Sequence, residues 1–383
     1  MPRPLNFPIA SLLIAVFSTA CGSSVELASD PNSQPPPPPE AQFKPSADPT
    51  TITEINERVG DLLVDEKRIY WAGMDGPYGN HWLRSCAKDD CANTVINYAT
   101  AYFAQSFGVQ SGQVYWLGSG GYPTCHIVLS CEIDGCNGAP REVGRPHTDA
   151  STPSGCAYAT TFTSDAAYLC GEQMLEKIPL SGAGPQLRLA FPKSCSAVAV
   201  NGDFVYWLGL SDTADTSLAL RRTPIDGSGS TQVLADNLRV TTNNYKYGMP
   251  EFQAQNIAFH SGFVYWSQGT LYGSIARCPL TGCLGEPEVV AQPLNTPTSL
   301  LIDGAVLYFQ HGTINRGSAI SRLTLPSGAP SDPLVFGVEA ESALATDDLF
   351  LYTATSDAKL SADGVWLDPW ASIRRIPKAG TQP

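Results

Sequence analysis

A ten-residue pattern, in which two short apolar runs flank a Gly, Asp, Ser or Asn turn, occurs seven times along this chain. One copy spans residues 257–266 and reads IAFHSGFVYW. Alternating apolar residues on both sides of a tight turn predict a β-hairpin. Aligned on the tyrosine of the second run, the copies recur every 40 to 60 residues or so, roughly the period of a supersecondary repeat. These tyrosines are Tyr70, Tyr115, Tyr168, Tyr206, Tyr265, Tyr308 and Tyr352.

Each hairpin is followed by two more strand-like segments. The third is Arg-rich, as in residues 320–325, and the fourth is short and apolar, as in residues 288–291. Four short strands per repeat are typical of a β-propeller blade. A single blade cannot bury both of its faces, whereas blades stacked in a ring bury them and expose only short edges. The sequence therefore predicts an all-β, seven-bladed β-propeller of four-stranded antiparallel blades over residues 51–383; six or eight blades would satisfy the same argument.

The last repeat ends after its third strand, while a strand-like run at residues 51–59 precedes the first repeat. We predict that this N-terminal run supplies the missing outer strand of the last blade and closes the ring.

The Tyr-Trp pair, followed by an Ile/Leu-x-Arg-x-x-Leu/Ile-Asp-Gly pattern, resembles the YWTD repeats of lipoprotein-receptor propellers and propeller repeats of secreted bacterial proteins. Two features depart from the receptor pattern, because no unit keeps the Thr-Asp after Tyr-Trp and the receptor family has six units. The resemblance implies the fold and not the receptor family's ligands. The fullest match is Tyr206, Trp207, Arg221, Ile225, Asp226 and Gly227.

Residues 1–20 contain a short apolar stretch behind a weakly basic start, which predicts a secretory signal peptide and is too short for a transmembrane span. Residues 18–21 resemble the lipobox of bacterial lipoproteins. That resemblance implies that Cys21 receives a lipid and becomes the mature N-terminus; cleavage after Ala20 by an ordinary signal peptidase is the alternative. We expect an exported protein of the bacterial cell envelope, an outer-membrane or cell-surface lipoprotein.

Residues 21–50 lack periodicity and include a run of five prolines at residues 35–39. This composition predicts a disordered, partly polyproline tether that holds the propeller away from the membrane to which the lipid attaches.

The chain has 11 cysteines, an odd number for an exported protein, and setting Cys21 aside leaves an even set that can pair. Three pairs share a spacing of five residues and fall in the turn between the third and fourth strands, where the two Cβ atoms come within bridging range. They lie on separate blades without a shared histidine, which argues against zinc. These predicted disulfides are Cys86–Cys91, Cys131–Cys136 and Cys278–Cys283.

The four remaining cysteines fall on one rim of the predicted ring. We predict the disulfides Cys125–Cys156 and Cys170–Cys195, which would join successive blades. Pairing Cys156 with Cys170 within one blade is the alternative.

The net charge of −13 argues against a nucleic-acid partner, because a phosphate backbone requires a basic surface. The chain lacks G-x-S-x-G, H-E-x-x-H, a phosphate-binding loop and zinc-finger spacing. No segment has the ligand spacing of a Ca²⁺ site either. We therefore predict no catalytic residue, no metal and no cofactor.

The long connections join the second strand to the third, or the fourth strand to the next blade. In a propeller these connections emerge on one face, and long loops on a rigid scaffold are typical of a binding surface. We predict a monomeric binding or interaction module for a protein, peptide or glycan. The alternatives are a propeller lyase or hydrolase acting on a polysaccharide or small molecule, and an envelope scaffold lipoprotein. The candidate contact residues are Trp366, Trp370, Trp82, Tyr122, Tyr245, Tyr247 and His126.

Overall fold

The computed structural model is all-β over the residues that it describes. These residues form 27 strands and one 3₁₀ turn, η1 (Cys91–Asn93). No helix within them is long and apolar enough to cross a membrane. The described residues are 49–55, 58–74, 81–101, 106–118, 127–147, 157–171, 173–212, 217–239, 257–269, 273–313, 317–326, 333–338, 344–357 and 370–378.

Four separate antiparallel sheets of four strands each follow one another along the chain. The first comprises β2 (Arg58–Val64), β3 (Arg68–Met74), β4 (His81–Ala87) and β5 (Ile96–Ala101). The second comprises β6 (Phe107–Gln110), β7 (Gln113–Gly118), β8 (Ile127–Glu132) and β9 (Arg141–Gly144). The third comprises β10 (Ala157–Phe162), β11 (Ala166–Gly171), β12 (Met174–Pro179) and β13 (Leu187–Ala190). The fourth comprises β14 (Cys195–Asn201), β15 (Phe204–Leu210), β16 (Ser217–Pro224) and β17 (Gln232–Arg239).

The last three repeats share one 11-stranded sheet. Its strands are β18 (Ile257–His260), β19 (Phe263–Gln268), β20 (Gly273–Pro279), β21 (Glu288–Asp303), β22 (Val306–Thr313), β23 (Gly317–Thr324), β24 (Val335–Val338), β25 (Ala345–Thr346), β26 (Phe350–Asp357), β27 (Trp370–Pro377) and β1 (Thr50–Ile55).

Two features fuse this sheet. The 16-residue β21 pairs with β20 through its first half and with β22 through its second half. In addition, Val338 of β24 pairs with Thr355 of β26. Divided only at β21, the sheets make six blades of a β-propeller, rather than the seven separate blades that the repeats predict.

The strand β1 pairs antiparallel with β27, so the N-terminal segment does supply the outer strand of the last repeat. The strand ends at Ile55, however, and Val59 already belongs to β2. The run predicted at residues 51–59 is therefore split between the last repeat and the first.

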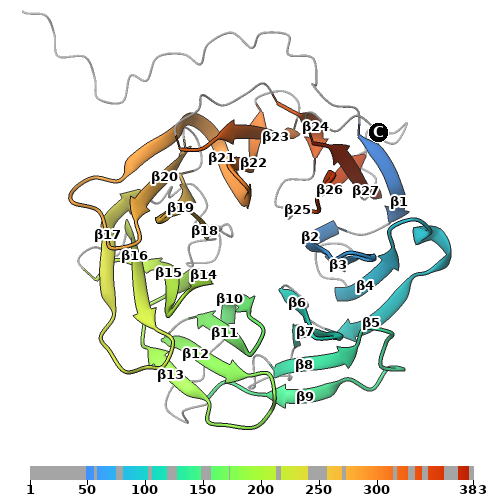
Figure 1. Cartoon of the computed structure of the whole chain (residues 1–383), viewed down its shortest axis with the longest axis horizontal. Coiled ribbons are helices and arrows are strands. Elements are labelled where there is room, and N and C mark those ends of the chain that lie inside the picture. The colour runs from blue at the N-terminus through green and yellow to red at the C-terminus, as the bar shows by residue number, and fades with distance from the viewer. Residues whose placement is uncertain are drawn as a thin grey trace, which may run out of the picture. The chain divides into compact units, whose positions relative to one another are not determined.

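The sheets are arranged in a ring, with the first strand of most repeats nearest its centre (Figure 1). Hydrophobic clusters between neighbouring repeats hold the ring together, and in each the second strand of one repeat packs against that of the next. Tyr206 shares a cluster with Trp266, for example, and Tyr352 shares one with Trp71, which joins the last repeat to the first. The tryptophans of the repeats are core residues: Trp71, Trp116, Trp207 and Trp266 are at most 3% exposed.

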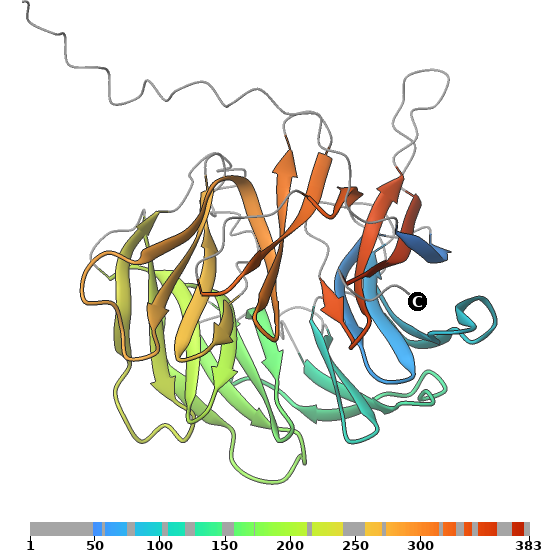
Figure 2. The same ribbon diagram turned by 45° about the horizontal axis from the view of Figure 1, so that its top comes forward.

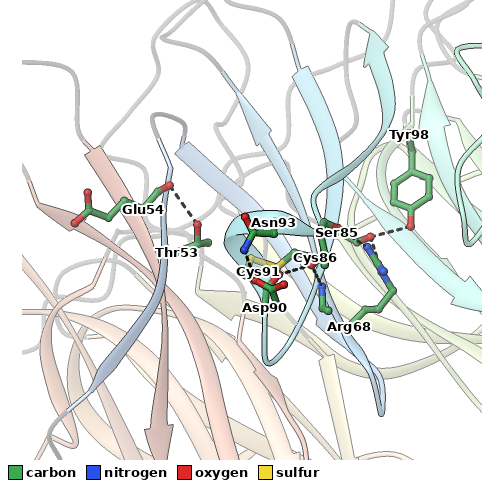
Figure 3. Close-up of a disulfide and its surroundings, with 11 residues drawn as sticks. Thr53, Glu54, Arg68, Ser85, Cys86, Asp90, Cys91, Asn93 and Tyr98 are labelled. Carbon is green, nitrogen blue, oxygen red and sulfur yellow. Dashed lines mark hydrogen bonds between the residues drawn. A yellow bond between two sulfur atoms is a disulfide. The ribbon is translucent and has the colours of Figure 1, made fainter.

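Three of the described disulfides close turns within a sheet, and a fourth joins two successive sheets. Cys86–Cys91, Cys131–Cys136 and Cys278–Cys283 each close a turn between a third and a fourth strand. In the first of these turns, Asn93 donates a hydrogen bond to Asp90, while nearby Arg68 donates to Ser85 (Figure 3). Cys170–Cys195 instead joins β11 to β14, in successive sheets.

Candidate functional site

The described turns between consecutive strands of a repeat gather on one side of the ring (Figure 2). We call the side on which the second and fourth strands end the loop face, and the opposite side the turn face. The first and second strands are joined on the turn face by short turns such as residues 202–203 and 261–262. The strand ends on the loop face include those of β17 and β26; the residues that follow them, 240–256 and 358–369, lie outside the described residues.

Hydrogen bonds between repeats fasten the turn face. Arg222 donates to the Leu280 carbonyl oxygen of the next repeat at 2.6 Å, and Arg277 donates in the same way to Pro326 at 2.8 Å. Between the last and first repeats, the Lys88 ammonium lies 2.7 Å from the Asp347 carboxylate. These three side chains are thus used in contacts between repeats, and we take the loop face as the candidate for binding.

Few of the predicted contact residues can be compared with the structure. Trp82 is described, and Trp370 begins β27 opposite Asp357, with its side chain outside the described part. The other predicted positions lie wholly outside the described residues; they are Trp366, Tyr122, Tyr245, Tyr247 and His126, together with Cys21, Cys125 and Cys156.

Trp82 lies near the start of β4, at the loop face, and is partly buried. The Arg84 guanidinium lies 4.8 Å from the centre of its ring, within range of a cation–π interaction. Arg84 is itself oriented by a 2.7 Å hydrogen bond to Asn97. Beside Trp82, burial lowers the pKa of the His81 imidazole. The position therefore offers an indole held in place by Arg84, whereas the His81 side chain projects from the other face of the strand.

A second cluster on this side of the ring surrounds the buried carboxylate of Glu176 in β12. Its side chain is 0% exposed. One carboxylate oxygen accepts a 2.9 Å hydrogen bond from Arg188 Nε, and the other accepts one of 2.9 Å from the His147 backbone N–H. The His147 Nδ1 atom lies 3.2 Å from that second oxygen. A buried carboxylate requires such partners, because an unpaired one would be strongly destabilising.

The carboxylate also determines the His147 tautomer. An ionised carboxylate only accepts hydrogen bonds, so Nδ1 must carry the proton that it donates to Glu176. The Nε2 atom, on the opposite side of the ring, is then a hydrogen-bond acceptor in neutral imidazole. The His147 side chain is 44% exposed.

Phe191 extends the cluster with an apolar surface. Its side chain is 71% exposed, and the Arg188 guanidinium lies 5.1 Å from the centre of its ring. The following residue, Pro192, is buried and accepts a 2.8 Å hydrogen bond from the backbone N–H of Gln173. The disulfide at Cys195 holds the chain shortly after it. Phe191 is thus an exposed aromatic residue on a fixed backbone.

The sequence did not predict this cluster, because His147, Glu176, Arg188 and Phe191 are not among the candidate contact residues. A signal was present, since Leu169 replaces the tryptophan of the repeat and Glu176 pairs with that leucine across the sheet. An acidic residue opposite a replaced tryptophan distinguishes the third repeat from the others.

Within the described ranges, no three His, Cys, Asp or Glu side chains come together as a metal-binding group. At Glu176, the partly exposed His147 and the exposed Phe191 are the groups that a ligand could contact.

Comparisons with known proteins give distant likenesses of fold. No family model matches the chain, and no curated protein matches it. Among solved structures, a TolB protein from Agrobacterium tumefaciens is 11% identical, with a TM-score of 0.41, over 84% of this chain and 91% of that one. The phage phi92 endosialidase is 10% identical, with a TM-score of 0.46, over 88% and 72% of the two chains. A nidogen/laminin complex is 12% identical, with a TM-score of 0.35, over 70% and 76%. These neighbours are β-propellers, TolB and the YWTD-type nidogen among them.

Proposed function

We propose that this chain is an exported, lipid-anchored β-propeller that binds a partner outside the cytoplasm through its loop face. The observation that carries the proposal is the contrast between the two faces. Arg222, Arg277 and Lys88 on the turn face are used in contacts between repeats. On the loop face, Phe191 and His147 turn 71% and 44% of their side chains to solvent. A rigid ring that presents exposed aromatic groups on one face suits recognition.

Export is supported by the four described disulfides, because such bonds persist in oxidising compartments. Cys21 is the residue to which the lipid would be attached. Replacing it by serine should release the protein from the membrane fraction into the soluble fraction, while retention of the variant in the membrane would contradict lipid anchoring.

We infer seven blades from the cores rather than from the sheets. Seven hydrophobic clusters occur among the described residues, and each combines side chains of two consecutive repeats. The long strand β21 then serves as the outer strand of the fifth blade and the inner strand of the sixth, which is why sheets alone give a smaller count. The strands β25, β26, β27 and β1 make the seventh blade.

Binding of the soluble Cys21→Ser protein to isolated cell envelopes tests the role of the loop face. We expect that replacing Trp82, His147 and Phe191 together weakens this binding by about tenfold or more, the loss of a typical contact residue. The matched control replaces two exposed leucines on turn-face turns, Leu284 (108% exposed) and Leu349 (53%). Equal binding by both variants, or a loss confined to the control, would contradict the proposal.

A further inference from the structure

The third sheet buries a carboxylate at a position where the other repeats have a basic or an uncharged residue. Opposite the tryptophan position, the second sheet has Leu129 and the fifth repeat has Ala276, whereas the fourth sheet has the buried Arg221. The third has Glu176, opposite Leu169. Burying a carboxylate is costly even when it is paired, so packing alone favours an apolar residue here. The carboxylate instead holds two surface groups, Arg188 and His147, in fixed positions.

Arg188 connects the other two groups of the cluster. Its Nη2 donates to the His147 backbone carbonyl oxygen at 3.3 Å, and its guanidinium lies 5.1 Å from the centre of the Phe191 ring. Arg188 is therefore in contact with both Phe191 and His147. Only Phe191 and His147 are substantially exposed, since the Arg188 side chain is 20% exposed.

The chemistry of this cluster selects among ligands. The charges of Arg188 and Glu176 compensate each other, so the site does not attract an ion, and the net charge of −13 disfavours anionic polymers. The exposed Phe191 ring suits a flat apolar surface, while His147 Nε2 suits a hydroxyl donor. A pyranose combines both, since its C–H groups form an apolar face and its hydroxyl groups line the ring.

We propose that Phe191 and His147 form a binding site for a neutral saccharide, in which Phe191 packs against the sugar ring and His147 Nε2 accepts a hydrogen bond from a sugar hydroxyl. Glu176 and Arg188 act as positioning residues, because they hold these two groups without touching the ligand. The inference rests on the proposed function of the loop face and names the ligand class for it.

Nuclear magnetic resonance of the His147 ring tests the site directly. The probes are methyl β-glucopyranoside, methyl α-mannopyranoside, methyl N-acetyl-β-glucosaminide and the β1,4-linked tetramers of glucose and N-acetylglucosamine. The spectrum of the His147→Gln variant assigns the ring signals. We expect at least one probe to shift them saturably, with a dissociation constant on the order of 1 mM or below. Phe191→Ala should raise that constant by about tenfold.

Matched controls separate the site from the rest of the surface. His260→Gln, in a turn-face turn, and Leu284→Ala should leave the affinity unchanged, and thermal unfolding should show that every variant is folded. Glucuronate tests the charge argument and should bind at least about tenfold more weakly than the best neutral probe.

Each contrary result overturns the inference: no neutral saccharide shifts the His147 signals, glucuronate binds equally well, or Phe191→Ala retains full affinity. The proposed function is judged separately. If envelope binding depends on the loop face while no saccharide binds, the saccharide site is refuted and the binding module stands. If saccharides bind but the replacement of Trp82, His147 and Phe191 does not weaken binding to envelopes, the proposed binding function of the loop face is refuted instead.

Discussion

Replacing Asp347 should open the ring at the junction between its last and first repeats. The Asp347 carboxylate accepts hydrogen bonds from Lys88 and from the Tyr352 hydroxyl, both at 2.7 Å, and from the backbone N–H groups of Leu349 and Phe350 at 3.0 and 2.9 Å. Asp347→Asn can keep the hydrogen bonds from the backbone but removes the negative charge that pairs with the Lys88 ammonium. The Lys88 side chain is only 17% exposed. We expect a loss of about 3 kcal/mol in the free energy of unfolding.

The first repeat provides the matched control. Asp65 accepts the same bonds from its own turn, with Tyr70 at 2.7 Å and the backbone of Lys67 and Arg68 at 2.7 Å each. In that turn we expect Asp65→Asn to cost only about 1 kcal/mol. The difference of about 2 kcal/mol measures the ion pair between repeats, and a double-mutant cycle with Lys88→Met should return a similar coupling energy.

Urea unfolding followed by tryptophan fluorescence measures these free energies, and pH gives an independent check. Burial alone would raise the pKa of Asp347, but the hydrogen bonds from Lys88, Tyr352 and the backbone hold it well below its usual range. The stabilisation is therefore present above the unfolded pKa near 4 and is lost as the pH falls below it. Equal losses for Asp347→Asn and Asp65→Asn, with no coupling to Lys88, would refute the reasoning.

Three further predictions concern the ring itself. Burial raises the pKa of the Asp61 carboxyl to about 7, although the carboxyl accepts a hydrogen bond from the backbone N–H of Phe107 in the second sheet. The free energy of unfolding of the wild-type protein should therefore fall by roughly 2–4 kcal/mol as the pH rises from about 4 to about 7. Thermal melts across this range should show a flatter profile for Asp61→Asn, and parallel profiles would contradict it. Deleting residues 50–55 removes the outer strand of the last repeat and should cost at least about 3 kcal/mol, whereas trimming as many residues upstream should cost little; equal melting temperatures would disprove ring closure by this strand. Replacing both Cys170 and Cys195 by serine opens a loop of 25 residues and should lower the free energy of unfolding by about 3.5 kcal/mol. Removing the Cys86–Cys91 disulfide, which closes a loop of five residues, should lower it by about 2 kcal/mol. A larger fall in the urea midpoint for the Cys86–Cys91 variant would contradict the loop-entropy argument.

The repeat made most of the fold predictable. Alternation around seven turns locates the hairpins, and the missing strand after Lys378 predicts the pairing of β1 with β27. The spacing of five residues between cysteines predicts the stapled turns, because that geometry is local.

The fusion of the last repeats was not predictable from local patterns. Residues 292–299 contain Pro293 and Pro297, which indicate a loop in a sequence, yet the structure continues β21 through them. Proline is tolerated there because the strand changes partners, and Pro297 falls where the pairing with β22 is irregular, between Asn295 and Thr298. The change of pairing partner from β20 to β22 depends on the tertiary structure, and the secondary-structure propensities of the residues do not predict it.

The candidate site was missed for a related reason. Glu176, Arg188 and His147 lie on separate segments, and their spacing in sequence follows no motif. They come together because Glu176 pairs with Leu169 across the third sheet, and because the chain after β9 places the His147 backbone N–H within hydrogen-bond distance of Glu176. Phe191 looks like an ordinary apolar residue in sequence, and only its 71% exposure sets it apart.

The strand β21 also affects how the ring would open under mechanical force. It is one continuous strand that belongs to both the fifth and the sixth repeats, and each of its halves is hydrogen-bonded to a neighbouring strand. At the junction between the last and first repeats, the described contacts include side-chain packing and the Lys88–Asp347 ion pair. A force applied to the chain upstream of β1 would act directly on that strand, so the ring should open first at this junction, while β21 still holds its two repeats together.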